Sequence, residues 1–442
     1  MPKAGFVSLG CAKNRVDTEV MLGILADKGI ELTDDPAEAD ILIINTCSFI
    51  SAAKDESIMT ILQMAEHKKT GRCRGLIVAG CLSQRYQQEL LDELPEVDAV
   101  LGTGAWHRIG EAVEVVLDGR RVIFSDPATT LYDETMPRIM TTPYYSAYVK
   151  VADGCSNCCS YCVIPRVRGN FRSRTIESVT AEVRRLADNG VKEINLIAQD
   201  TTSYGQDLYG APQVVSLLRE LIRIPSVKWI RLLYCYPSFL TDEIIALMAG
   251  EEKILSYVDL PLQHIHDDIL TAMNRRDKRA DITRLLAKIR STVPGVAVRT
   301  SFIVGFPGET DEHFQALKQF IVEQKFDHVG VFTYSQEDDT PAGAMENQVP
   351  ETIKEERYHE LMALQSQISE ELNRRREGEI AEVLLEGAHP DQPNVVFGRT
   401  YREAPDVDGR IYVENAAELQ AGDMIPVRIL QGFTYDLVAE TL

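Results

Sequence analysis

The sequence predicts an α/β chain of three units: an N-terminal parallel α/β domain, a central series of six β/α units and a small C-terminal β-barrel. Short apolar runs alternate with helical patterns up to residue 350, and the pattern changes to short alternating strands after Glu377. The length of 442 residues, with 45% hydrophobic and 26% charged residues, suits a globular chain of several domains.

The charge balance is strongly acidic, with 46 Lys and Arg against 67 Asp and Glu and a formal net charge of −21. Because a phosphate backbone is bound by clustered cations, this excess argues against a surface devoted to nucleic acid and leaves room for a basic protein partner. No apolar stretch approaches the roughly 18 residues that span a bilayer. The N-terminus also lacks the apolar core of a signal peptide, so we expect a cytoplasmic protein with no membrane partner.

Residues 1–125 form the expected N-terminal domain, and a linker follows over 126–143. Alternation of apolar runs with amphipathic stretches predicts right-handed crossovers and a parallel sheet with helices on both faces. The expected strands and helices lie at 6–9, 16–26, 41–45, 51–67 and 76–79.

One cysteine follows each of these three strands: Cys11, Cys47 and Cys81. The carboxyl ends of parallel strands share one rim, so the three thiols can converge there. Three thiolates at one rim suit a soft metal or an iron–sulfur cluster, and a cluster with only three protein ligands keeps one iron open for chemistry. Chance is the alternative, because cysteine is often simply buried. Cys73, in a polar turn, fits no such pattern.

The strongest motif lies in the central unit, where Cys155, Cys159 and Cys162 form a C-x3-C-x2-C loop after a strand-like run. Three thiolates in so short a loop must surround one compact centre. A structural zinc site normally has a fourth Cys or His in regular spacing, which is not found downstream. A disulfide is disfavoured in a reducing compartment. Cys158 has the wrong spacing for a ligand of this set, and Cys235 has no assigned role.

This loop resembles the hallmark of the radical S-adenosylmethionine (SAM) superfamily, including an aromatic residue, Tyr161, before the last cysteine. The resemblance implies that the three thiolates hold a [4Fe–4S] cluster and that SAM chelates its open iron. Electron transfer then cleaves SAM to a 5′-deoxyadenosyl radical. It also implies an open (β/α)6 partial barrel over residues 144–350, with functional groups at the carboxyl ends of the strands.

The partial barrel is expected to contain strands at 148–151, 194–198, 229–234, 257–260, 298–304 and 329–334. In the resemblance, residues at strand ends line the SAM and substrate cavity, and the cofactor-binding candidates are Gln199, Gly305 and Glu309. No catalytic residue is assigned.

Two further groups of polar residues have open alternatives. His264 and His266 follow a strand and either act directly or are satisfied core groups. Arg166, Arg168 and Arg174 either contact a carboxylate or form a solvated basic segment.

The last part of the chain begins with a polar, helix-forming connector at 351–376. Residues 377–442 then show five short strands, expected at 380–385, 394–401, 410–413, 424–429 and 433–438, which predict a small closed barrel of the OB type. This segment holds 4 Arg, no Lys and 13 Asp or Glu, a formal charge of −9.

The three units together resemble the methylthiotransferases over essentially the whole chain. In this family Cys11, Cys47 and Cys81 match the ligands of a second [4Fe–4S] cluster, and the C-terminal barrel matches the substrate-recognising TRAM domain. The implied reaction uses two SAM molecules: one methylates sulfur on the auxiliary cluster, and the other yields the radical that abstracts a hydrogen from the substrate carbon. An electron donor and a sulfur donor are implied as partners.

The family modifies either a tRNA adenosine or a protein aspartate. Lys13-Asn14 after the first cysteine resembles the ribosomal branch of the RimO type, whose substrate is an aspartate β-carbon of protein twelve of the small ribosomal subunit. The acidic barrel agrees, because it would repel RNA, so we expect no stable nucleic-acid partner, and it would attract a basic ribosomal protein. The alternatives are a tRNA adenosine methylthiotransferase and a non-enzymatic iron–sulfur carrier or sensor. Asp339 departs from the family pattern, in which glycine often precedes Thr340.

Overall fold

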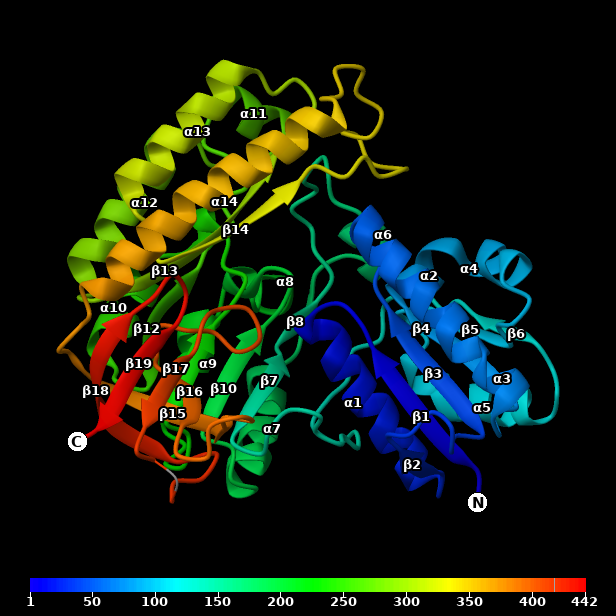
Figure 1. Ribbon diagram of the computed structural model, residues 1–442. Coiled ribbons are helices and arrows are strands. Elements are labelled where there is room, and N and C mark those ends of the chain that lie inside the picture. Colours follow the sequence, from blue (N-terminus) through cyan, green and yellow to red (C-terminus); the bar gives the residue numbers. More distant parts are fainter. Residues whose placement is uncertain (417) are drawn as a thin grey trace.

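The computed structural model describes residues 1–416 and 418–442 and confirms the expected fold class (Figure 1). Two six-stranded parallel sheets and one closed five-stranded barrel account for the three units, with a short two-stranded ribbon beside the central sheet. The N-terminal domain lies beside the central domain, and the C-terminal barrel packs against the central domain (Figure 1). The barrel also contacts the N-terminal domain, where Arg15 pairs with Asp406 at 3.0 Å.

The N-terminal sheet has the strand order β2-β1-β3-β4-β5-β6, and every neighbouring pair is parallel. Its two central strands are fully buried, and except for Asn45 their residues are apolar or small, as expected for a sheet covered on both faces. The strands are β1 Lys3–Ser8, β2 Glu31–Thr33, β3 Ile41–Thr46, β4 Gly75–Gly80, β5 Ala99–Leu101 and β6 Val122–Phe124. The helices are α1 Ala12–Asp27, α2 Ser51–Ala65, α3 His67–Thr70, α4 Cys81–Glu93, η1 Trp106–Arg108 and α5 Ile109–Leu117.

Helix α1 begins directly after Cys11, four residues earlier than the apolar pattern predicts. Its first turns carry Lys13, Asn14 and Asp17, which are polar and yet buried. These residues face the central domain rather than solvent, so a pattern of apolar residues alone places the start of the helix too late.

The central sheet runs β14-β13-β12-β11-β10-β7, so that its parallel strands follow one another in chain order and leave two free edges. This is the open arrangement expected of a partial barrel. The strands are β7 Ser146–Lys150, β10 Glu193–Ile197, β11 Trp229–Leu232, β12 Ile254–Asp259, β13 Ala297–Val304 and β14 His328–Thr333, with the ribbon β8 Ala152–Asp153 and β9 Arg172–Ser173. The helices are α6 Ile164–Arg168, α7 Ile176–Asp188, η2 Thr201–Ser203, α8 Gln206–Tyr209, α9 Val214–Leu221, η3 Pro237–Phe239, α10 Asp242–Gly250, α11 Asp267–Ala272, α12 Arg279–Thr292 and α13 Asp311–Gln324.

The expected connector is one long helix, α14 Glu351–Arg374, which lies along β14 (Figure 1). It joins the central domain to the C-terminal barrel and also completes the central core, because Leu361 and Ile368 belong to the same buried apolar cluster as the sheet. The sequence of α14 does not indicate this role, because charged residues such as Lys354 and Arg357 are among its buried side chains.

The C-terminal strands β15 Ile380–Ala388, β16 Val396–Arg399, β17 Ile411–Glu414, β18 Met424–Gly432 and β19 Leu437–Thr441 close in the order β15-β16-β17-β19-β18. The expectation of a strand at 433–438 is wrong in its position. The Phe433 N–H donates to the Asp436 carbonyl at 2.9 Å, so residues 433–436 form the turn before β19. The exposed aromatic residues of this turn, Phe433 and Tyr435, imitate a strand pattern.

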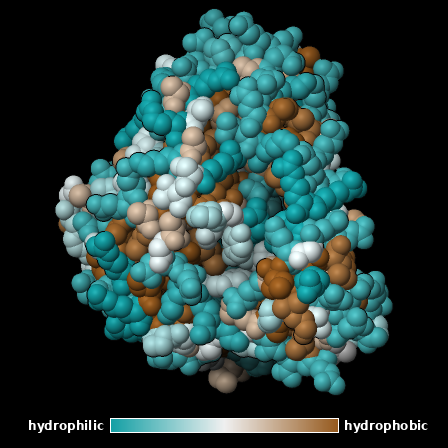
Figure 2. Space-filling model, turned by 90° about the vertical axis from the view of Figure 1, so that its left-hand side faces the viewer, coloured by the Kyte–Doolittle hydropathy of each residue, from teal (hydrophilic) through white to brown (hydrophobic). Residues whose placement is uncertain are grey.

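Within the described part of the chain, none of the helices has the length and apolar character needed to cross a membrane. The face drawn in Figure 2 mixes hydrophilic residues with smaller hydrophobic patches.

Candidate functional site

Three cysteines, Cys11, Cys47 and Cys81, gather at one rim of the N-terminal sheet, as the strand ends predict. Cys11 precedes α1, Cys47 follows β3 and Cys81 opens α4. The backbone approaches closely here: a Cβ added to Gly10 would lie 2.8 Å from the Cβ of Cys47. All three are free thiols that affect one another electrostatically.

The electrostatic environment of this rim differs among the three thiols. Burial raises the pKa of Cys81 to about 12 and also raises the pKa of Cys47. Burial alone would raise the pKa of Cys11 as well, but the charges of Lys13 and Arg168 outweigh it and lower the pKa. The thiolate form that a metal needs is therefore best supported at Cys11.

The second triad, Cys155, Cys159 and Cys162, wraps one turn of chain after the central sheet's first strand. Burial raises the pKa of Cys155 to about 11 and that of Cys162 further, and the neighbouring Cys159 adds to both shifts. Arg275 places its Nη1 atom 3.9 Å from the Cys159 sulfur. Cys158, in contrast, is exposed with a φ of 51°, which places it outside the triad.

The two triads are neighbours. Val163, the residue after Cys162, packs against Cys81 together with Val167 in one small apolar cluster. The rim of the N-terminal sheet therefore meets the cysteine loop of the central domain directly, and side chains from both domains line the space around them.

A buried ionic network joins the two domains at this place. Arg168 donates to Asp17 at 2.9 Å, to Asp153 at 3.1 Å and to the side-chain oxygen of Asn14. Lys150 binds the same two carboxylates. Because a buried charge without its partners is costly, this network fixes the domains against each other.

The sequence left open whether Arg166, Arg168 and Arg174 contact carboxylates or form a solvated basic segment, and the structure gives a different answer for Arg166 than for the other two. Arg168 and Arg174 are buried and contact carboxylates, Arg174 that of Glu182, so a solvated basic segment is wrong for both. Arg166 is exposed and forms a surface pair with Asp339 at 3.1 Å.

Gln199 lies at the end of β10 with its amide nitrogen donating to Asp153 at 3.0 Å. Its Oε1 atom is buried and has no partner within the described structure, so it is available to a ligand. A pocket of about 210 Å³ opens beside Cys155 and is lined by Asn157, Asp200 and Arg276 among others. A larger pocket of about 660 Å³ lies apart, between α1, the linker and α7, and no cysteine lines it.

Gly305 and Glu309 are engaged within the protein. The Glu309 carboxylate accepts from the Gly305 N–H at 2.9 Å and from Arg357 at 2.8 Å. A Cβ on Gly305 would lie 2.2 Å from the Cγ of Lys354. These contacts fasten the loop after β13 to α14, and a cofactor role for the two residues stays a prediction.

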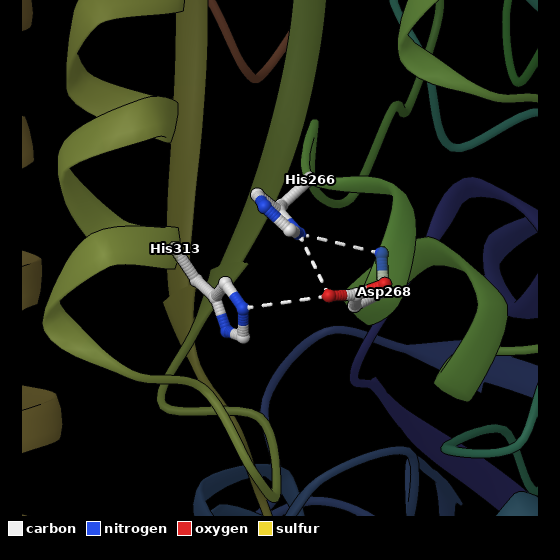
Figure 3. Close-up of side chains that lie close together, drawn as sticks. All are labelled: His266, Asp268 and His313. Atoms are coloured by element: carbon white, nitrogen blue, oxygen red, sulfur yellow. Dashed lines mark hydrogen bonds and ion pairs between the residues drawn. The ribbon is translucent and has the colours of Figure 1, made fainter.

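The two histidines have different surroundings. His264 is fully buried, and burial lowers its pKa to about 3, so it is neutral; its Nε2 atom lies 3.7 Å from Glu309 without a hydrogen bond. His266 lies with Asp268 and His313, and their ligand atoms lie within 4.8 Å of one another (Figure 3). However, the Nδ1 atoms of His266 and His313 accept from backbone N–H groups at the starts of α11 and α13. Helix capping accounts for this cluster.

Sequence reasoning missed Asp153 and Lys150, which hold the domain network together. The available signal was the pair of charged residues on either side of the buried segment Val151-Ala152, directly before the cysteine loop.

Three family models match the chain, and their order is that of the three units. They are an uncharacterized protein family, UPF0004, over residues 3–102, the radical SAM superfamily over 149–321, and the TRAM domain over 378–442.

Among solved structures, the chain is similar to a radical S-adenosylmethionine methyltransferase, TsrM, from Kitasatospora setae, with cobalamin and a [4Fe–4S] cluster bound. The TM-score is 0.56 at 17% identity, and the match covers 77% of each chain. At this identity the likeness concerns the fold.

Curated relatives match along the whole length. A relative from Pelotomaculum thermopropionicum is 50% identical over 440 residues, covering 100% of this chain and 99% of its own. A relative from Geobacter sulfurreducens is 51% identical over 442 residues, covering 100% and 98%. Both are named ribosomal protein uS12 methylthiotransferase RimO. With this identity and coverage, the chain belongs to the RimO family of radical SAM methylthiotransferases.

Proposed function

We propose that this enzyme transfers a methylthio group to the β-carbon of an aspartate in ribosomal protein uS12. It would use two SAM molecules and two [4Fe–4S] clusters, one held by Cys11, Cys47 and Cys81 and the other by Cys155, Cys159 and Cys162. The observation that carries the proposal is the direct contact of Cys81 with Val163, which makes the two triads neighbours.

The residues present fit these groups. Each triad offers three thiols and leaves one iron of a cubane cluster without a protein ligand. The unpartnered Oε1 of Gln199 offers a polar acceptor, and the pocket beside Cys155 offers space for part of SAM. When bound, the clusters and SAM supply the carbon-centred radical and the methylated sulfur.

The chain's own residues bind and position. Gly10 and Gly80 allow the backbone to approach the first triad, because both have positive φ and neither has a side chain in the way. Arg168 and Lys150 hold the domains in register, so that a substrate carbon between the triads keeps one position. Partial burial of the cysteines limits the access of bulk water to the reacting atoms.

The proposed partners follow from the chemistry and the charge. A one-electron donor and a sulfur donor are needed, and the substrate is a basic protein that the acidic C-terminal barrel attracts. We also propose that the chain works in the cytoplasm, where such a substrate is made.

Anaerobic reconstitution with SAM, reductant, sulfide and uS12 tests the proposal. Mass spectrometry should show a gain of about 46 Da on one aspartate, as SCH₃ replaces hydrogen. Iron analysis should give about eight irons per chain, falling to about four when either cysteine triad is replaced by alanine. Cys158→Ser is the control and should keep all of them. Modification of tRNA with unmodified uS12 would contradict the proposal.

A further inference from the structure

Lys13 is a largely buried residue whose ammonium group has no carboxylate partner among the described residues. Its side chain belongs to the second residue of α1, and the residue is only 6% exposed. Its Nζ atom lies 3.2 Å from the centroid of the Tyr234 ring. Among the residues that the structure describes, no hydrogen bond or ion pair reaches this ammonium group.

Other buried cations of the chain do have such partners. Arg275 donates to the Pro261 carbonyl and approaches the Cys159 sulfur. The rest form ion pairs with carboxylates: Lys150, Arg168, Arg174, Arg231, Lys354, Arg357, Arg376 and Arg399. A cation–π contact offsets only part of the cost of burying an ammonium group. The Cys11 thiol, whose pKa Lys13 lowers, is the anionic group beside it, and no carboxylate of the described chain pairs with Lys13, so its ammonium group can bind one from outside.

The position of Lys13 lies between the two halves of the site. It is two residues after Cys11, whereas Tyr234 follows β11 at the carboxyl end of the central sheet. Tyr234 is held in a left-handed conformation, with a φ of 60°, by its N–H donating to Asp259 at 2.9 Å. The aromatic ring thus supports the ammonium group at the junction where the two domains meet.

We propose that Lys13 binds the side-chain carboxylate of the aspartate that the enzyme modifies. This inference rests on the proposed function and names the residue that selects an acidic side chain. A carboxylate completes the ion pair that Lys13 lacks. The β-carbon of aspartate is the methylene group bonded directly to that carboxylate, so a bound carboxylate also holds the carbon that is modified. A neutral adenine base offers the lysine no such charge.

The test compares uS12 carrying the target aspartate with uS12 carrying asparagine there, using the reconstituted enzyme. With the wild-type enzyme, both proteins can be added as competitors of uS12 modification. The asparagine protein should compete about tenfold more weakly than the unmodified aspartate protein, because a charged hydrogen bond is lost. Lys13→Met should raise KM for the aspartate protein by about tenfold and remove the difference between the two proteins. Lys13→Arg should retain part of the difference. Lys28→Met, on the exposed end of the same helix, is the control.

Iron content and the reduction potentials of the clusters, followed by electron paramagnetic resonance, provide the second readout. If Lys13→Met shifts a potential or loses iron while the preference for aspartate stays, Lys13 only balances the thiolate charge and the inference is overturned. If the wild type modifies uS12 but binds both proteins equally, this inference alone fails. If it modifies tRNA and not uS12, the proposed function fails with it.

Discussion

Gly10 and Gly80 show how single residues shape the first triad. Both have positive φ, 84° and 94°, and each stands directly before a cysteine of the rim. A Cβ on Gly80 would lie 2.3 Å from the side-chain oxygen of Asn45 and 2.6 Å from the carbonyl oxygen of Thr46. Since the second of these atoms is backbone, it cannot turn away.

Gly80→Ala should therefore destabilise the protein by about 3 kcal/mol, the sum of left-handed strain and steric overlap. Gly29→Ala is the matched control: its φ is 75°, but nothing lies within 4 Å of the added atom. The control should lose only about 1 kcal/mol. Urea unfolding of the two variants measures the difference, and equal losses would show that the overlap is relieved.

At the scale of residues, the sequence predicts the six cysteines and Gln199 as site residues but not the charged groups between them. Cysteine spacing after strands is visible along the chain, whereas the pairing of Asp17 with Arg168 joins residues of two domains. The departure at Asp339 is also understandable: its φ is 65°, a conformation that glycine adopts freely and aspartate tolerates.

Among the elements, β10 and β16 carry the attachment of the C-terminal barrel. Glu193 in β10 accepts from Arg399 in β16 at 2.7 Å, and Arg231 lies on the same carboxylate at 3.3 Å. All three side chains are buried. Burial would raise the pKa of Glu193, but the two arginines outweigh it and lower the pKa to about 2.

The lowered pKa gives a pH dependence with a definite sign. The stabilisation by Glu193 is complete above its unfolded pKa of about 4.5 and is lost as the pH falls towards 2. It amounts to about 3 kcal/mol. Glu193→Gln should lower stability at pH 7 by about 3–5 kcal/mol, because two arginines stay buried without a carboxylate.

Thermal unfolding between pH 3 and pH 7 tests this expectation. The wild-type and Glu193→Gln curves should converge in acid. Glu66→Gln, which removes an exposed pair with Lys69, should follow the wild type throughout. Parallel curves for wild type and Glu193→Gln would contradict the ionic attachment.

Most helices and strands were predictable from the sequence, because the spacing of apolar residues differs between buried strands and amphipathic helices. The errors occur where side chains of another element decide the outcome. Helix α1 starts early because its polar first turns face the central domain, and the last strand starts late because exposed aromatic residues occupy the turn before it. Neither neighbour is visible from the local sequence.

For the whole molecule, the acidic C-terminal barrel separates into two sets of charges. The carboxylates of one set are neutralised by ion pairs within the protein: Glu386 binds Arg399, Glu403 binds Arg376 and Asp408 binds Arg299. The other set is exposed and includes Glu377, Glu379, Glu382, Asp391, Glu414 and Glu418. The exposed surface of the barrel is therefore acidic, but less so than the sequence charge suggests.

The triple variant Glu382→Lys, Glu414→Lys and Glu418→Lys should slow association with uS12 by about tenfold at low salt, because it removes electrostatic attraction to a basic protein. The effect should shrink as ionic strength rises. Stopped-flow association kinetics measure both. Glu89→Lys, Asp92→Lys and Glu93→Lys change the same charge on the N-terminal domain, and an equal effect there would show that only net charge matters.

Helix α14 is fastened at both of its ends. Arg357 holds Glu309 of the central domain, and Asn373 donates to the carbonyl of Phe433 in the C-terminal barrel at 2.8 Å. A protein docked on that barrel can therefore offer the cysteine triads only the segment that lies at one set distance from its docking point. Under the proposed function, helix α14 would set the distance between the docking point and the modified residue, so that length as well as charge would select the target.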